Sequence, residues 1–100
     1  MIKHIVMLKL LEEAECAAKS ENVVKIKNLL EELPAKIPFI KGYEVGINII
    51  ESDRAFDISL ISVFNSIDDL NRYLEHPEHK KAGEYILKRR QTGISCDYEF

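Results

Sequence analysis

The sequence predicts an α+β protein with the element order β-α-β-β-α-β, and three observations carry this prediction. Apolar residues alternate with other residues in four stretches, which is the spacing of strands. Apolar residues recur at helical spacing in two regions between these stretches. The chain has 100 residues, enough for one domain, so we predict a single domain over residues 1–100. This order is the split βαβ, or ferredoxin-like, pattern, with a four-stranded antiparallel sheet and both helices on one of its faces.

The first strand and the first helix are predicted within the first third of the chain. Residues 2–10 alternate, and one face of this strand carries Ile2, His4, Val6, Leu8 and Leu10. Residues of about 17–33 follow helical spacing, with apolar residues at Val23, Ile26, Leu30 and Leu33. Pro34 follows directly, and we expect it to end this helix.

Two strands are predicted in the middle of the chain. Residues 41–50 alternate, and Gly42 and Gly46 lie on the face opposite Tyr43 and Val45. A polar turn is expected at residues 51–54, and residues 56–64 alternate again as a third strand.

The second helix is predicted in two parts. Ser66 has the side chain of an N-cap, and the helix that it begins runs to about Glu75. Pro77 is suited to restart a helix, and Lys88, Arg89 and Arg90 are placed to complement its C-terminus. These basic residues are interpreted as a solvated helix face. Residues 94–100 alternate as a fourth strand.

This architecture predicts a homodimer through the sheet face. If both helices cover one face of the sheet, the other face carries Ile5, Met7, Ile61 and Val63. An uncovered apolar face of this size requires a cover. A second copy that packs its own sheet against the first would supply one.

The composition bounds the classes of partner. The formal net charge is −3, whereas nucleic-acid-binding proteins carry a basic excess, so we expect no nucleic-acid partner. No apolar run approaches the roughly 20 residues of a membrane span, and we expect no membrane insertion. Cys16 and Cys96 share no motif and are interpreted as reduced thiols of a cytoplasmic protein.

A resemblance adds to this interpretation. The segment from Tyr73 to His79, with His4 near the start of the first strand, resembles the stress-responsive α/β-barrel (Dabb) family. The resemblance continues through residues 43–46 and through Asp97 and Tyr98. It implies a ferredoxin-like domain that pairs into a dimeric α/β barrel. Most members of the family have no assigned reaction. The positions of His79, Tyr73 and His4 match the catalytic His and Tyr and the supporting His of a plant polyketide cyclase with a similar pattern.

The chemistry of these residue types fits such a role. Pro77 would place His79 in the first turn of a helix, where the positive helix end disfavours imidazolium. A neutral imidazole can act as a base at pH 7. The Tyr73 hydroxyl could stabilise an enolate oxygen, and His4 would enter the same cavity. Proton abstraction beside a carbonyl of a small apolar ligand, followed by ring closure, needs no cofactor.

Other interpretations remain open at this point. His4 and Tyr73 could be hydrogen-bonded core residues, and His76 could cap a helix. His76 and His79 with nearby glutamates offer only a weak metal site, and no metal residue is assigned. A non-catalytic ligand-binding or stress-response module, or a monooxygenase by fold analogy alone, are the alternative functions.

Overall fold

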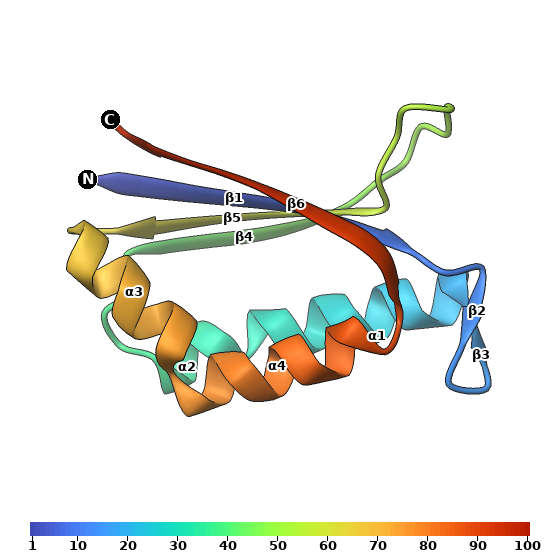
Figure 1. Ribbon diagram of the computed structural model, residues 1–100, viewed down its shortest axis with the longest axis horizontal. Coiled ribbons are helices and arrows are strands. Elements are labelled where there is room, and N and C mark those ends of the chain that lie inside the picture. Colours follow the sequence, from blue (N-terminus) through green and yellow to red (C-terminus); the bar gives the residue numbers. More distant parts are fainter.

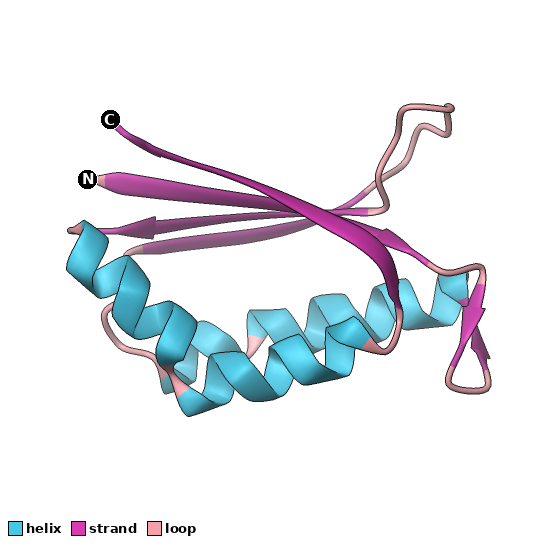
Figure 2. Ribbon diagram, viewed as in Figure 1, coloured by secondary structure: helices cyan, strands magenta, loops and turns pink.

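The computed structural model describes all residues from 1 to 100 and has two layers (Figure 1). One layer is a sheet of β4 (Gly42–Ile47), β5 (Ile58–Phe64), β1 (Ile2–Leu10) and β6 (Arg90–Glu99), in that order. All neighbouring strands are antiparallel. The other layer is helical, and it covers one face of the sheet (Figure 2). The predicted ferredoxin-like α+β fold with a four-stranded antiparallel sheet is confirmed.

The helical layer contains four helices in two broken pairs. The first pair is α1 (Lys19–Glu31) and α2 (Leu33–Lys36), and the second is α3 (Ile67–Glu75) and α4 (Pro77–Leu87). The second pair is divided at His76, as predicted, and Ser66 caps α3 by accepting a hydrogen bond from the Asp69 amide. None of the four helices has the length and hydrophobicity of a membrane-spanning segment.

The expectation that Pro34 ends the first helix was wrong. The break lies at Glu32, and Pro34 is in the first turn of α2. Proline is tolerated there because the amides of a first turn have no partner inside the helix.

The C-terminal boundaries also differ from the prediction. Helix α4 ends at Leu87, so Lys88 is the C-cap and the last turn has no basic residue. Strand β6 begins at Arg90 rather than at residue 94, so Gly93 lies inside this strand. The last strand is therefore longer than predicted, because it pairs with β1 along the whole length of β1.

A small hairpin that the sequence did not indicate precedes α1. Strands β2 (Glu13–Ala14) and β3 (Ala17–Ala18) are joined by Glu15 and Cys16, with φ of 51° and 61°. Two positive φ values in a two-residue loop are typical of a type I′ turn, which usually contains Asn or Gly. Asn22 of α1 holds the hairpin by donating hydrogen bonds to the carbonyl oxygens of Ala14 and Ala17.

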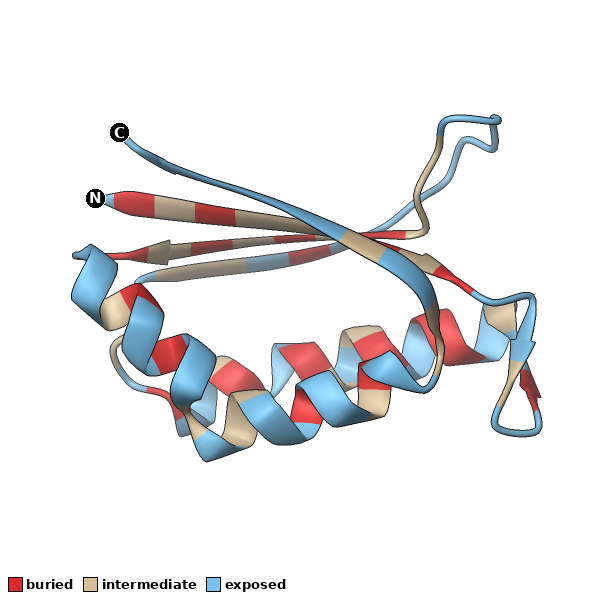
Figure 3. Cartoon of the chain, viewed as in Figure 1, coloured by how far each residue is buried: buried red, intermediate tan, exposed pale blue.

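The hydrophobic core lies between the two layers (Figure 3). The helix-facing residues of β1 are almost all buried, and Ile26 of α1, Phe64 of β5 and Tyr73 of α3 have no exposed surface. The alternation in the sequence of β1 therefore predicts correctly which of its residues face the core, since successive side chains of a strand point to opposite faces.

The other face of the sheet carries apolar side chains with no cover. It contains Ile5, Met7, Ile61, Val63, Ile94, Tyr98 and Phe100, and Ile94 and Phe100 are 47% and 58% exposed. The segment between β4 and β5 rises beyond the sheet on the side away from the helices (Figure 1). At its start, Ile49 and Ile50 are 91% and 73% exposed.

Candidate functional site

A cavity of about 490 Å³ lies under the helix-facing side of the sheet, beside α3 and α4. The three residues predicted from the sequence, His4, Tyr73 and His79, all line it. Much of the remaining lining is aliphatic and includes Val6, Leu8, Leu60 and Ile86. The cavity therefore combines an apolar volume with two imidazoles and a phenol.

His79 is held in one orientation by the break between α3 and α4. His76 caps α4, and its Nδ1 accepts a hydrogen bond from the Glu78 amide, which starts the helix just before His79. His79 Nδ1 lies 3.1 Å from the carbonyl oxygen of Leu74. A carbonyl oxygen only accepts, so Nδ1 carries the proton and donates. In the neutral ring the other nitrogen, Nε2, is then a free base.

The protein environment favours this neutral form of His79. Burial lowers the pKa of the His79 imidazole, and the neighbouring His4 and His76 lower it further, while the bond to Leu74 acts in the opposite direction. The direction agrees with the prediction from the sequence. The main cause is burial in an apolar cavity rather than the helix end, because burial disfavours the charged form.

His4 is oriented by a residue from the far end of the chain. Strands β1 and β6 pair so that His4 is opposite Asp97, and the His4 Nδ1 forms a hydrogen bond with an Asp97 carboxylate oxygen. A carboxylate accepts, so Nδ1–H donates and Nε2 is the remaining nitrogen. A carboxylate of this kind fixes the tautomer and the orientation of an imidazole.

Both Nε2 atoms are accessible. Neither the Nε2 of His4 nor that of His79 has a hydrogen-bond partner within the protein. The only fully buried side-chain nitrogen or oxygen without a partner is Nε of Arg89. Because His4 and His79 both line the cavity, a ligand can reach these two nitrogen atoms.

Tyr73 is packed more tightly than either imidazole. Its ring centroid lies 4.5 Å from that of His79 and 5.0 Å from that of Phe64. The residue has no exposed surface, and its hydroxyl oxygen lies 3.0 Å from the hydroxyl oxygen of Tyr43. Burial raises the pKa of the Tyr73 phenol. The phenol therefore stays protonated at neutral pH and can donate a hydrogen bond.

The histidines around the α3–α4 break do not form a metal centre. His76 uses Nδ1 to cap α4, and His79 uses Nδ1 on Leu74. No three His, Cys, Asp or Glu side chains converge anywhere in the structure. The capping role considered for His76 from the sequence is confirmed.

The sequence reasoning missed three residues of the site. Asp97 was noted only as part of the resemblance, although antiparallel pairing of the first and last strands brings residue 97 near residue 4. Tyr43 was placed on the correct face without a partner. Arg90 was interpreted as part of a solvated helix face, but it begins β6, is half-buried and lines the cavity.

The fold and the cavity define a ferredoxin-like α+β protein with a histidine- and tyrosine-lined chamber between its sheet and its helices. The chain belongs to the stress responsive A/B barrel domain (Dabb) family, whose sequence profile matches residues 2–100. The resemblance seen in the sequence is therefore confirmed.

Two similar proteins have no assigned function. An uncharacterized protein of Streptomyces coelicolor is 31% identical over 100 residues, which is the full length of both chains. A dimeric protein of unknown function with a ferredoxin-like fold, from Bacteroides fragilis, is 35% identical. That structure superposes with a TM-score of 0.83 over 99% of this chain and 95% of the other.

Two structures of named enzymes share the fold at lower identity. A hydroxynitrile lyase from Passiflora edulis is 18% identical, with a TM-score of 0.77 over 97% of this chain and 90% of the other. An antibiotic biosynthesis monooxygenase is 15% identical, with a TM-score of 0.72 over 100% and 98%. At these identities the likeness shows the fold alone, because one fold hosts many functions.

Proposed function

We propose that the chain is an enzyme that removes a proton next to a carbonyl group of a small apolar or polyketide-like substrate, with His79 as the base. The observation that carries the proposal is the accessible Nε2 of His79 at an apolar cavity, with Nδ1–H held by Leu74. The lowered pKa keeps this nitrogen unprotonated at neutral pH. A positioned base of this kind contributes about 10²–10⁴-fold in rate.

The proposed reaction balances without a cofactor. His79 Nε2 takes a proton from the carbon beside the carbonyl, and the electron pair of the broken C–H bond moves onto the carbonyl oxygen as an enolate. The enolate carbon then attacks a second carbonyl of the same molecule. The imidazolium of His79 returns its proton to the alkoxide that forms. His4 lines the same cavity, with Nδ1–H bonded to Asp97 and Nε2 without a partner in the protein.

Tyr73 supplies the donor for the enolate oxygen in this proposal. Its raised pKa suits a donor rather than a base. The Tyr73 hydroxyl can accept a hydrogen bond from Tyr43 and donate its own proton to a substrate. Because Tyr73 is fully buried, this donation requires neighbouring side chains to move as the ligand enters. Tyr73 also packs against the ring of His79.

The proposal includes a homodimer formed through the open sheet face. This face carries a continuous group of apolar side chains from β1, β5 and β6. The B. fragilis protein of the same fold is dimeric. The segment between β4 and β5, with its two exposed isoleucines, projects on the same side and would extend along the second copy (Figure 1).

The experiment that tests the base is deuterium exchange into a linear β-diketone in D₂O, followed by NMR against a protein-free background. His79→Ala should remove the enzymatic rate. His76→Asn is the matched control, because it deletes an imidazole outside the cavity lining while keeping a side chain that caps helices well. If both variants retain the wild-type rate, His79 is not the base.

The same cavity would also serve a protein that binds an apolar ligand without converting it. The observation that favours this second candidate is the complete burial of Tyr73, which leaves its hydroxyl unexposed. Saturable binding of a β-diketone without exchange above background would select this alternative. The monooxygenase alternative rests on the fold alone.

A further inference from the structure

We infer that the cavity takes an elongated, mainly apolar carboxylic acid, whose carboxylate binds Arg90 at the end of the cavity away from His4. The inference deepens the proposed function, because it names the class of substrate for that cavity. The predicted binding of a carboxylate depends only on Arg90 and its surroundings, so it can be tested separately from catalysis.

Arg90 is a cation without a partner. It is half-buried and lines the cavity, yet it takes part in none of the ion pairs or side-chain hydrogen bonds of the structure. The other charged residues of the lining are Lys80 and Glu84, and both are exposed. A guanidinium presents a planar set of donors that matches a carboxylate, and removing it partly from water without a partner is unfavourable. An anionic ligand would supply the partner that the Arg90 guanidinium lacks.

The missing side chain of Gly93 leaves room for the Arg90 guanidinium against the sheet. A Cβ atom on Gly93 would lie 2.7 Å from Arg90 Nη1 and 3.2 Å from Leu8 Cδ2. Any side chain at this position would therefore displace the guanidinium or Leu8. Because Gly93 is opposite Leu8 on β1, the charged end of Arg90 lies near Leu8.

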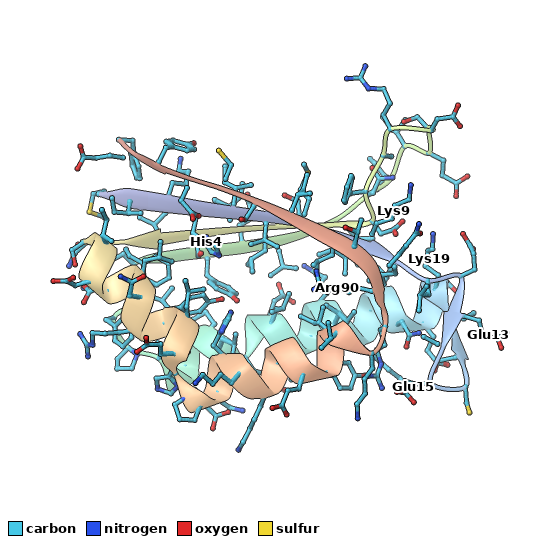
Figure 4. All side chains as sticks on the ribbon, viewed as in Figure 1. His4, Lys9, Glu13, Glu15, Lys19 and Arg90 are labelled. Atoms are coloured by element: carbon cyan, nitrogen blue, oxygen red, sulfur yellow. The ribbon has the colours of Figure 1, made fainter.

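The distance along β1 sets the length of the ligand. His4 and Leu8 are on the same face of β1 and four residues apart, which corresponds to roughly 13 Å at the usual rise of a strand. Val6, Leu8 and Leu60 line the cavity along this path. Figure 4 shows His4 and Arg90 both in the space between the sheet and the helices, at separate points along the strands.

The arrangement fits a molecule with three parts. A carboxylate binds Arg90, an apolar chain lies along the aliphatic lining, and two carbonyl groups at the far end reach the imidazoles. A long-chain diketo acid has this order of groups. A neutral molecule of the same length would leave Arg90 without a partner.

The test is isothermal titration calorimetry of wild-type protein with decanoate and, as the neutral match, decanol. Decanoate should bind at least about tenfold more tightly, because charge-assisted hydrogen bonds are roughly twice as strong as neutral ones. Arg90→Met keeps an apolar stem and should remove this preference while decanol binding is retained. Gly93→Ala should reduce the preference while keeping the charge. Lys88→Gln, outside the cavity lining, is the control for net charge and should have no effect.

A second measurement uses wild-type protein, so it tests the inference even if Arg90→Met does not fold. In wild-type protein labelled with ¹⁵N, the Arg90 Nε–H signal should shift on titration with decanoate and stay unchanged with decanol. Equal affinity for the two probes with an unmoved Arg90 signal would overturn the inference. If His79→Ala still binds decanoate and still exchanges the β-diketone at the wild-type rate, the catalytic proposal is overturned. The anion site at Arg90 is then still supported.

Discussion

The imidazole of His4 is hydrogen-bonded through Nδ1 to the carboxylate of Asp97, 93 residues away along the chain. The pair forms because the first and last strands are neighbours in the sheet, with His4 opposite Asp97. The Asp97 side chain is 44% exposed, whereas the His4 side chain is 8% exposed. The carboxylate is therefore partly in solvent, while the imidazole that it bonds to is buried. We predict that its main effect is to orient this imidazole rather than to stabilise the fold.

Asp97→Asn separates these two effects. A hydrogen bond contributes about 0.5–1.5 kcal/mol net, and the amide of asparagine can still bond to His4, so the free energy of unfolding should change by less than about 1.5 kcal/mol. The exchange rate on the β-diketone should fall about tenfold or more, since the amide can present its N–H to His4 and favour the other tautomer. Chemical denaturation and the NMR exchange assay measure the two quantities. Asp68→Asn, at an exposed residue in the first turn of α3, is the control and should leave the exchange rate unchanged.

The two tyrosines can be distinguished by removing one hydroxyl at a time. Tyr73→Phe keeps the ring packed against His79 and Phe64, and Tyr43→Phe removes the partner hydroxyl. Each change leaves one buried hydroxyl without its partner, so both variants should lose about 1–2 kcal/mol of stability. If the Tyr73 hydroxyl holds the enolate oxygen, Tyr73→Phe alone should lower the exchange rate by about 10²-fold. Equal β-diketone exchange rates in the two variants would show that the Tyr73 hydroxyl has no role in the reaction and that the residue only packs in the core.

The open sheet face predicts a dimer that a single charge can dissociate. Ile61 lies at the middle of this face, opposite Ile5 on β1. Ile61→Lys should convert the dimer into a monomer in sedimentation velocity, because burying an unpaired ammonium is costly. Val24→Lys replaces a 50% exposed residue of α1 on the other side of the molecule and should leave the dimer intact. A wild-type protein that sediments as a monomer at all concentrations would contradict the proposed interface.

The β2–β3 hairpin offers a stabilising substitution. Cys16 has a φ of 61°, a left-handed conformation that costs a residue with a side chain about 1–2 kcal/mol. Glycine avoids this cost but loses about 0.5–1 kcal/mol through the entropy of the unfolded chain. Cys16→Gly should therefore raise the free energy of unfolding by about 0.5–1 kcal/mol in chemical denaturation. Ala14→Gly, in strand β2 at a residue without a positive φ, should lower it instead.

The sequence was most informative where burial follows a regular period. The alternation along residues 2–10 predicted strand β1 and the face that it buries. This worked because β1 is a central strand, and only one of its faces packs against the helices. Ser66 and the break before Pro77 were predictable from capping chemistry, which depends on adjacent residues. The hairpin was not predictable, since Glu15 and Cys16 are unusual residues for a type I′ turn.

The candidate site was predictable only in part. His4, Tyr73 and His79 were selected through the resemblance and the helix start, and the structure places all three at one cavity. Asp97 and Tyr43 were missed as partners because their roles depend on strand register, which no local pattern reveals. Arg90 was missed because its place beside Gly93 depends on where β6 begins, two residues after the C-cap of α4.

The most direct test of the account is the pH dependence of β-diketone exchange by wild-type protein and by His79→Ala. A base acts in its unprotonated form, so the rate should be level at high pH and fall as His79 gains a proton. Because burial lowers the pKa of His79 below its usual 6.5, the wild-type rate at pH 6.5 should exceed half of its maximum, and the variant should show no rate above background. A wild-type rate that is already halved at or above pH 6.5, or a variant with the same profile, would contradict the assignment of His79 as the base.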